Sequence, residues 1–153
     1  IHDRIMEILI EKGGEYSHGF TYSGHPVSCA VALENIKILE EENLIEKVAT
    51  ETGPYLKKRW QEFENQKIVG EVRNVGMLGA IELVEDKKNR KFFPSSKKVG
   101  ETCRDFCFQN NLVMRAINDT MIVSPPLTIT TDQIDEMFYL VKHCLDLTAK
   151  KIF

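Results

Sequence analysis

The chain has 153 residues, of which 42% are hydrophobic and 28% are charged, a composition typical of one globular domain and not of a disordered segment. The 20 Lys and Arg residues against 23 Asp and Glu residues give a net charge of −3, which argues against a nucleic-acid-binding module and against an anionic membrane surface as partner. No apolar run approaches the ~20 residues of a membrane span, and no basic-then-apolar leader opens the chain.

The N-terminal part is predicted to be helical. Apolar residues recur at three- and four-residue intervals, the period of one helix face, and charged residues lie on the other side. We expect one helix over residues 2–12, a second that starts at Pro26, and a third over residues 44–63. The third helix should kink at Gly53-Pro54, because a proline inside a helix removes a backbone donor.

The period then changes to that of strands. The short loop around Asn118-Asp119-Thr120 predicts a hairpin, and Thr130 with Gln133 forms a capping box at the start of a last helix. Another helix is expected after Ser95 or Ser96, either of which could cap it. The resulting order α-α-α-β-β-α-β-β-α favours an α+β fold over a parallel βαβ fold. The strands are expected at residues 68–75, 76–84, 112–117 and 121–124.

The cysteines predict a reducing compartment. They form no CxxC pair, and Cys103 and Cys107 share one helix face. We therefore expect reduced, mostly buried thiols and a cytoplasmic protein. His18, His25 and Cys29 have no fourth ligand at a recognised spacing, so no metal site is expected, and structural roles are favoured for both histidines.

The loop HGFTYSGHP, residues 18–26, is the most informative stretch. It places glycines and hydroxyl groups directly before a predicted helix, where small residues let a backbone approach a ligand and the helix N-terminus favours an anion. Thr21, Ser23 and nearby backbone amides could hold a phosphate. On these residues alone, a loop that only caps the helix is the favoured alternative.

Three segments resemble one family. HGFTYSGHPVSCAVALENIKILEEENL, GEVRNVGMLGAIELV and NNLVMRAINDTMIVSPPLTITTDQIDEMF follow each other in the order found in class III aminotransferases, which are pyridoxal-phosphate enzymes of fold type I. The omega-amino-acid:pyruvate group is the most similar. The resemblance implies the C-terminal small domain of such an enzyme, with a small, mainly antiparallel sheet and helices packed on it. Residues 1–26 would be the tail of the large cofactor-binding domain, including the phosphate loop, and residues 27–153 the small domain with its leading long helices.

The resemblance assigns cofactor contacts to Thr21 and Phe20. In the family, the threonine of this loop reaches across a homodimer interface and binds the phosphate of the pyridoxal 5'-phosphate held by the other subunit. The backbone N–H of Phe20 is the expected second donor. A hydroxyl that donates to a phosphate oxygen makes a charge-assisted hydrogen bond, which is stronger than a neutral one.

Arg115 is the candidate substrate contact. It is the only charge in the apolar run 112–117, and a buried guanidinium there would need an anion. From the residues alone, an edge-strand arginine that faces water or pairs with a structural carboxylate is favoured. In omega-aminotransferases the matching arginine binds the substrate carboxylate, and the resemblance implies that role here. Unlike ornithine- and GABA-type relatives, this chain has no arginine just before Pro125-Pro126, which favours the pyruvate group.

The Schiff-base lysine of the family is not expected in this chain. Lys12 and Lys37 lie in charged helical settings without the family's lysine motif, so no catalytic residue is assigned. Since the chain opens at Ile1 in mid-pattern, we expect a C-terminal part of a longer enzyme that is inactive alone. The intact parent would move an amino group from an omega-amino acid or amine to a keto acid such as pyruvate.

Two alternatives stay open. The chain could be a non-catalytic α+β binding or dimerisation module of the same ancestry. It could also belong to a related pyridoxal-phosphate aminomutase or decarboxylase. The amino donor and the exact acceptor are not determined by these residues.

Overall fold

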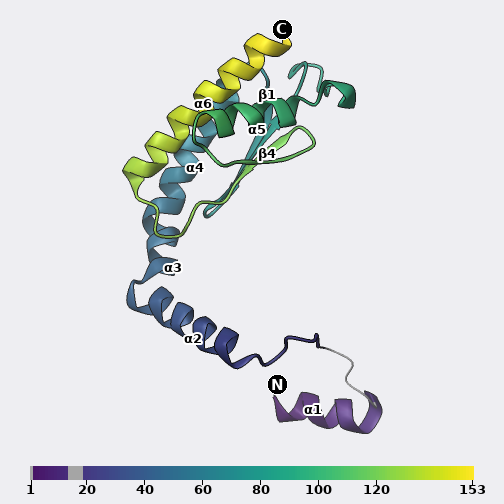
Figure 1. Ribbon diagram of the computed structural model, residues 1–153, viewed down its shortest axis with the longest axis vertical. Coiled ribbons are helices and arrows are strands. Elements are labelled where there is room, and N and C mark those ends of the chain that lie inside the picture. The colour runs from purple at the N-terminus through teal and green to yellow at the C-terminus, as the bar shows by residue number, and fades with distance from the viewer. Residues whose placement is uncertain (1, 14–18) are drawn as a thin grey trace. The chain divides into compact units, whose positions relative to one another are not determined.

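The computed structural model describes residues 2–13 and 19–153 (Figure 1). The chain divides into two units, Ile1–Ile38 and Leu39–Phe153. This division falls within helix α2 (Pro26–Glu41), which starts at Pro26 as predicted. The assignment of residues 1–26 and 27–153 to two domains of a larger enzyme stays a prediction.

The first unit contains α1 and most of α2. Helix α1 (Asp3–Ile8) begins after His2, whose ring Nδ1 accepts a hydrogen bond from the Arg4 backbone N–H at 3.3 Å. It continues into a π-helical turn, Leu9–Gly13. Helix α2 buries none of its residues, so its predicted apolar face is open within this unit.

The α-helical hydrogen bonding is interrupted directly before Gly53-Pro54, where a kink is predicted. The helix expected over residues 44–63 is divided into successive segments. These are α3 (Leu44–Lys47), a π-helical turn (Val48–Thr52), α4 (Gly53–Gln61) and a short 3₁₀ turn (Glu62–Asn65). The Gly53 N–H donates to the Val48 carbonyl oxygen, one residue further back than in an α-helix. A Cβ at Gly53 would collide with that same oxygen. The wide turn therefore requires glycine, and Pro54 follows where its missing N–H is tolerated.

The sheet is fully antiparallel, with strand order β1-β2-β4-β3. Its predicted α+β class is confirmed. The strands pair as two hairpins joined through β2 and β4, with an irregularity in β1 between Val69 and Glu71. The bounds are β1 (Val69–Val75), β2 (Leu78–Leu83), β3 (Arg115–Ile117) and β4 (Thr120–Val123).

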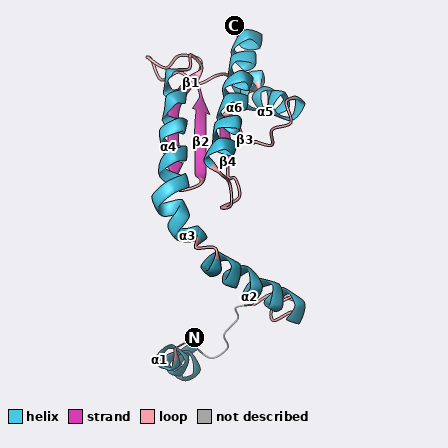
Figure 2. Cartoon of the chain, turned by 90° about the vertical axis from the view of Figure 1, so that its left-hand side faces the viewer, coloured by secondary structure: helices cyan, strands magenta, loops and turns pink. Residues whose placement is uncertain are grey.

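Helices α4, α5 (Val99–Gln109) and α6 (Thr131–Ile152) build the core against one face of this sheet, and Figure 2 shows α4 and α6 running along it. Trp60 is fully buried and lies over Gly79, where a Cβ would come within 2.9 Å of the indole ring. Phe63 connects the helices, since its ring lies 5.0 Å from that of Trp60 and stacks 4.6 Å from that of Phe138. The other face of the sheet carries charged side chains such as Glu71 and Arg73.

The two predicted helix caps have different outcomes. The capping box of α6 is confirmed, because Thr130 and Gln133 exchange both hydrogen bonds. The prediction that Ser95 or Ser96 caps the next helix is wrong. These serines form a 3₁₀ turn (Ser95–Lys97), and α5 starts only after Lys98, which has a left-handed φ of 48° and provides no side-chain cap.

Candidate functional site

The loop before α2 is held by its own hydrogen bonds. The Phe20 backbone N–H donates to Ser23 Oγ at 3.0 Å, and the Ser23 N–H donates back to the Phe20 carbonyl at 2.8 Å. His25 stands at the start of α2, where its Nδ1 accepts from the Ser28 N–H at 3.4 Å. The predicted structural role of His25 is thus observed. His18 lies outside the described residues.

Thr21 lies at the exposed tip of this turn. Its hydroxyl makes no hydrogen bond to any residue that the structure describes. The N–H of Phe20, in contrast, is already engaged by Ser23. Thr21 is therefore available to an external acceptor, whereas Phe20 could serve as second donor only if the Ser23 contact were exchanged.

The charge around Thr21 suits a phosphate group. Residues 19–33 contain no acidic side chain, and the first turn of the 16-residue α2 holds none. The positive end of a helix dipole therefore faces the turn without a competing carboxylate from this segment. Gly24, with φ 72°, closes the turn in a conformation that a side chain would strain. The described residues thus fit a phosphate ester at the level of charge and donors.

Arg115 lies at the start of the edge strand β3, on the sheet face opposite the helices. The register places it beside Ile122 of β4, which pairs with Ala80 of β2. The neighbouring row, Ala116 with Met121 and Ile81, faces the core, because successive residues of a strand point to opposite faces. Arg115 is exposed, and within the described part of the chain its guanidinium has neither a hydrogen bond nor an ion pair. This is the edge-strand arrangement of the alternative interpretation, and it leaves all five N–H donors available to a carboxylate.

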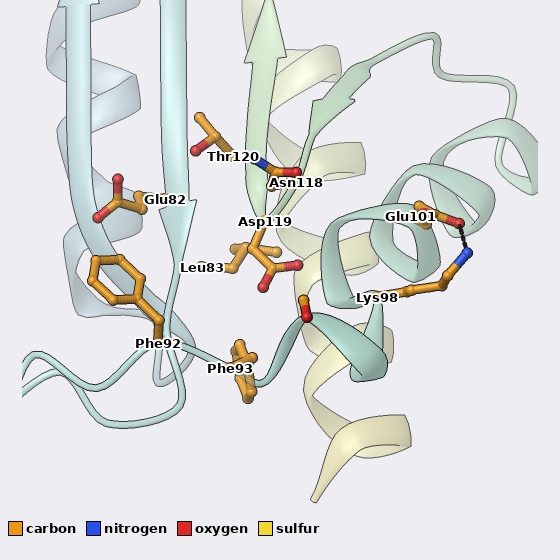
Figure 3. Close-up of a pocket in the computed structure, with 10 residues that line it drawn as sticks. Glu82, Leu83, Phe92, Phe93, Lys98, Glu101, Asn118, Asp119 and Thr120 are labelled. Carbon is orange, nitrogen blue, oxygen red and sulfur yellow. Dashed lines mark hydrogen bonds and ion pairs between the residues drawn. The ribbon is translucent and has the colours of Figure 1, made fainter.

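The predicted contacts are carried by different units, Thr21 and Phe20 by the first and Arg115 by the second. The structure also shows a hollow that the sequence did not predict. A cavity of about 410 Å³ opens where β2, the β3–β4 turn and the start of α5 meet (Figure 3). Glu82, Asp119 and Lys98 line it, and Lys98 pairs with Glu101 at 3.3 Å. Arg115 is not among its lining residues.

Three buried thiols lie between α5 and α6, as the cysteine pattern predicted. Cys103, Cys107 and Cys144 are free and buried, whereas Cys29 is exposed. A hydrogen bond from Cys103, followed by burial, raises the pKa of Cys107, and burial raises the pKa of Cys144. These two thiols stay protonated near neutral pH and are poor nucleophiles. In the described ranges, no group of three or more His, Cys, Asp or Glu residues could hold a metal ion.

Comparison with known proteins identifies the family. The class-III aminotransferase profile matches residues 2–145. The chain belongs to this family. A putrescine–pyruvate aminotransferase from Pseudomonas aeruginosa is 58% identical over 152 residues, which cover 99% of this chain and 33% of that enzyme. A mitochondrial gamma-aminobutyrate transaminase from Solanum lycopersicum is 38% identical over 141 residues, covering 92% of this chain and 27% of that protein.

Solved aminotransferase structures agree with this assignment. A PMP-bound aminotransferase from Vibrio fluvialis superposes with a TM-score of 0.88 at 33% identity, over 98% of this chain and 33% of that one. The chain spans about a third of the length of the relatives it matches. None of the described helices is both long and apolar enough to cross a membrane.

Proposed function

We propose that the complete protein is a pyridoxal-phosphate-dependent aminotransferase of the omega-amino-acid:pyruvate type. It would transfer an amino group from an omega-amino acid or amine to a keto acid such as pyruvate. The observation that carries this proposal is the 58% identity to a putrescine–pyruvate aminotransferase over nearly the whole chain. The absence of an arginine just before Pro125-Pro126 in the sequence supports the pyruvate group over the GABA type.

In this proposal, Thr21 binds the cofactor phosphate. Its exposed hydroxyl and the acid-free start of α2 support an anion contact. Phe20 is the second donor, and its N–H would exchange Ser23 Oγ for a phosphate oxygen. The contact is made across a homodimer of fold type I subunits, so that each loop completes the partner's cofactor site.

Arg115 binds the carboxylate of the substrate. A guanidinium fits a carboxylate with two parallel hydrogen bonds, and Arg115 makes no ion pair with any described residue. Ile122 and Ala80 lie in its cross-strand row, so an apolar surface adjoins the charge. This arrangement suits an omega-amino acid, whose methylene chain separates its two polar ends.

The remaining chemistry depends on groups outside this chain. Bound pyridoxal phosphate supplies an electron sink for transfer of the amino group. We place the Schiff-base lysine in another part of the complete protein, because neither Lys12 nor Lys37 has the family's motif. Binding and orientation of phosphate and carboxylate are the tasks of this chain. The buried free thiols support a cytoplasmic location.

The test is amino transfer by the complete protein loaded with pyridoxal phosphate. With putrescine or an omega-amino acid as donor and pyruvate as acceptor, we expect alanine in equal amount to the donor consumed. Release of CO₂ without alanine would indicate a decarboxylase, and migration of the amine within the donor would indicate an aminomutase. The 153-residue chain alone, assayed in parallel, should show no turnover.

A further inference from the structure

The β3–β4 turn is bound to two other elements through one residue. Asn118 and Asp119 form its two central positions, with Asn118 at a left-handed φ of 50°. The Asp119 carbonyl accepts a hydrogen bond from the Leu83 N–H of β2 at 2.8 Å. The Asp119 side-chain Oδ1 accepts from the Gly100 N–H of α5 at 2.9 Å. Asp119 therefore connects the turn to the sheet and to α5 at the same time.

The contact to α5 replaces a missing local cap. Lys98, the residue before α5, provides no side-chain hydrogen bond to the first turn, so Asp119 satisfies one of the free N–H groups there. A carboxylate also interacts favourably with the positive end of the helix dipole. Figure 3 shows Asp119 between the end of β2 and the start of α5.

The backbones meet closely at this contact. A Cβ on Gly100 would collide with the Asn118 carbonyl oxygen, so the turn lies directly on the first turn of α5. Gly100 and Asp119 therefore serve the same contact. Gly100 lets the turn approach the backbone of α5, and the Asp119 carboxylate holds the turn there by a hydrogen bond.

This anchored turn leads directly into the strand that carries Arg115. Strand β3 has three residues, Arg115–Ile117, and β4 is its one neighbour in the described sheet. On one side of Arg115, the Met114 side chain is buried at 2% exposure. On the other side, the strand ends at the Asn118-Asp119 turn. The path of β3 is therefore defined by the core at Met114 and by the hydrogen bond of Asp119 to α5.

We propose that Asp119, seated on Gly100, is a positioning residue for Arg115. It holds the β3–β4 hairpin at one place on α5, so that the guanidinium meets the substrate carboxylate in a fixed geometry. This inference rests on the proposed carboxylate contact of Arg115. Small displacements of a binding group cost much of its effect, so loosening the turn should weaken recognition of the carboxylate and not amino transfer in general.

The experiment compares two donors in the complete, cofactor-loaded protein, with pyruvate as acceptor. One donor is an omega-amino acid, and the other is an amine of the same length without the carboxylate. Asp119→Ala should lower kcat/KM for the amino acid about tenfold more than for the amine, mainly through KM. Asp119→Asn keeps an oxygen acceptor for the Gly100 N–H, so the ratio of kcat/KM for the amino acid to kcat/KM for the amine should return most of the way to that of the parent protein. Asp105→Ala removes a carboxylate from α5 whose one ion-pair partner among the described residues is the adjacent Arg104, and it should leave the ratio of the two kcat/KM values unchanged.

The parallel variant Arg115→Ala separates the two hypotheses. Suppose that Arg115→Ala changes the ratio of kcat/KM for the amino acid to kcat/KM for the amine. If Asp119→Ala then lowers kcat/KM equally for both donors, or for neither, the positioning inference is wrong while the role of Arg115 stands. If Arg115→Ala leaves the ratio unchanged, the carboxylate contact fails and the inference fails with it. Should Asp119→Ala not fold, Asp119→Glu keeps the charge and lengthens the link by one methylene. A donor ratio shifted in the same direction supports the inference, and an unshifted ratio contradicts it.

Discussion

The segment that carries Thr21 and the hairpin that carries Arg115 are supported in different ways. Residues 19–38 are exposed throughout, and α2 leaves large apolar side chains such as Leu33 and Ile36 uncovered. The hairpin, in contrast, belongs to a sheet whose inner face is filled by α4, α5 and α6. Helix stability in proteins comes mostly from packing of an apolar face. The geometry around Arg115 is therefore defined by packing within its own unit, whereas the described residues of the first unit provide no such packing for the Thr21 loop and α2.

A matched pair of leucines tests this difference with the largest expected effect. Leu56 of α4 is completely buried, and Leu33 of α2 is 70% exposed. In the 153-residue chain, Leu56→Ala should lower the free energy of unfolding by about 2–5 kcal/mol, because it leaves a cavity in the core. Leu33→Ala should change it by less than about 0.5 kcal/mol. Urea unfolding followed by fluorescence of the single, buried Trp60 measures both, and equal losses would show that α2 is packed as firmly as the core.

Two glycines at π-helical turns test the same contrast with a smaller effect. Gly53→Ala places a methyl group against the Val48 carbonyl and should cost about 1–3 kcal/mol. Among the described residues, a Cβ at Gly13 would meet the Leu9 side chain at an ordinary 3.6 Å, so Gly13→Ala should be neutral or slightly stabilising because alanine restricts the unfolded chain. Thermal unfolding followed by circular dichroism measures whether each substitution raises or lowers the melting temperature. A destabilised Gly13→Ala variant together with an unaffected Gly53→Ala variant would contradict the predicted difference between the two turns.

The smallest expected effect is a pH dependence in the second unit. Lys91, and then Lys97, hold the pKa of Glu85 below its ordinary value of 4.5. A carboxyl group with a lowered pKa in the folded state stabilises the fold above its unfolded pKa, and this contribution disappears as the pH falls through the folded value. Glu85→Gln should therefore be slightly less stable than the parent chain at neutral pH and equal to it in stronger acid.

The matched control for this pH series is Glu34→Gln in α2, which removes the same charge from an exposed pair with Lys37 at 3.5 Å. Melting temperatures of the three proteins between pH 3 and pH 7 provide the comparison. If the Glu85→Gln deficit persisted unchanged into acid, the ion pairs of Glu85 would not be its cause.

Most of the fold follows from periodicity and local signals. The strands and the capping box at Thr130 each depend on neighbouring residues, and each was predictable for that reason. The start of α5 was not, because its cap comes from Asp119, 19 residues later in the chain. A cap across the fold leaves no local pattern, and Ser95 and Ser96 offered a false one.

The candidate site was predictable only in part. The Gly-rich loop indicated Thr21 through its hydroxyl and its place before a helix, and the structure shows that hydroxyl exposed. The sequence could not indicate that Ser23 already engages the Phe20 N–H, since this depends on the conformation of the turn. For Arg115 the apolar run left open whether the guanidinium is buried. Its exposed place on an edge strand became evident only from the register with β4.

The central claim, that Thr21 binds a cofactor phosphate, is tested most directly by affinity. Equilibrium dissociation constants of the complete protein are measured for pyridoxal phosphate and for pyridoxal, which lacks the phosphate. Loss of one charge-assisted hydrogen bond, about 1.5–3 kcal/mol, should weaken binding of pyridoxal phosphate to Thr21→Ala by about 10- to 150-fold and leave pyridoxal unchanged, with Thr21→Ser close to the parent protein. An equal change for both compounds, or no change for either, would contradict the account.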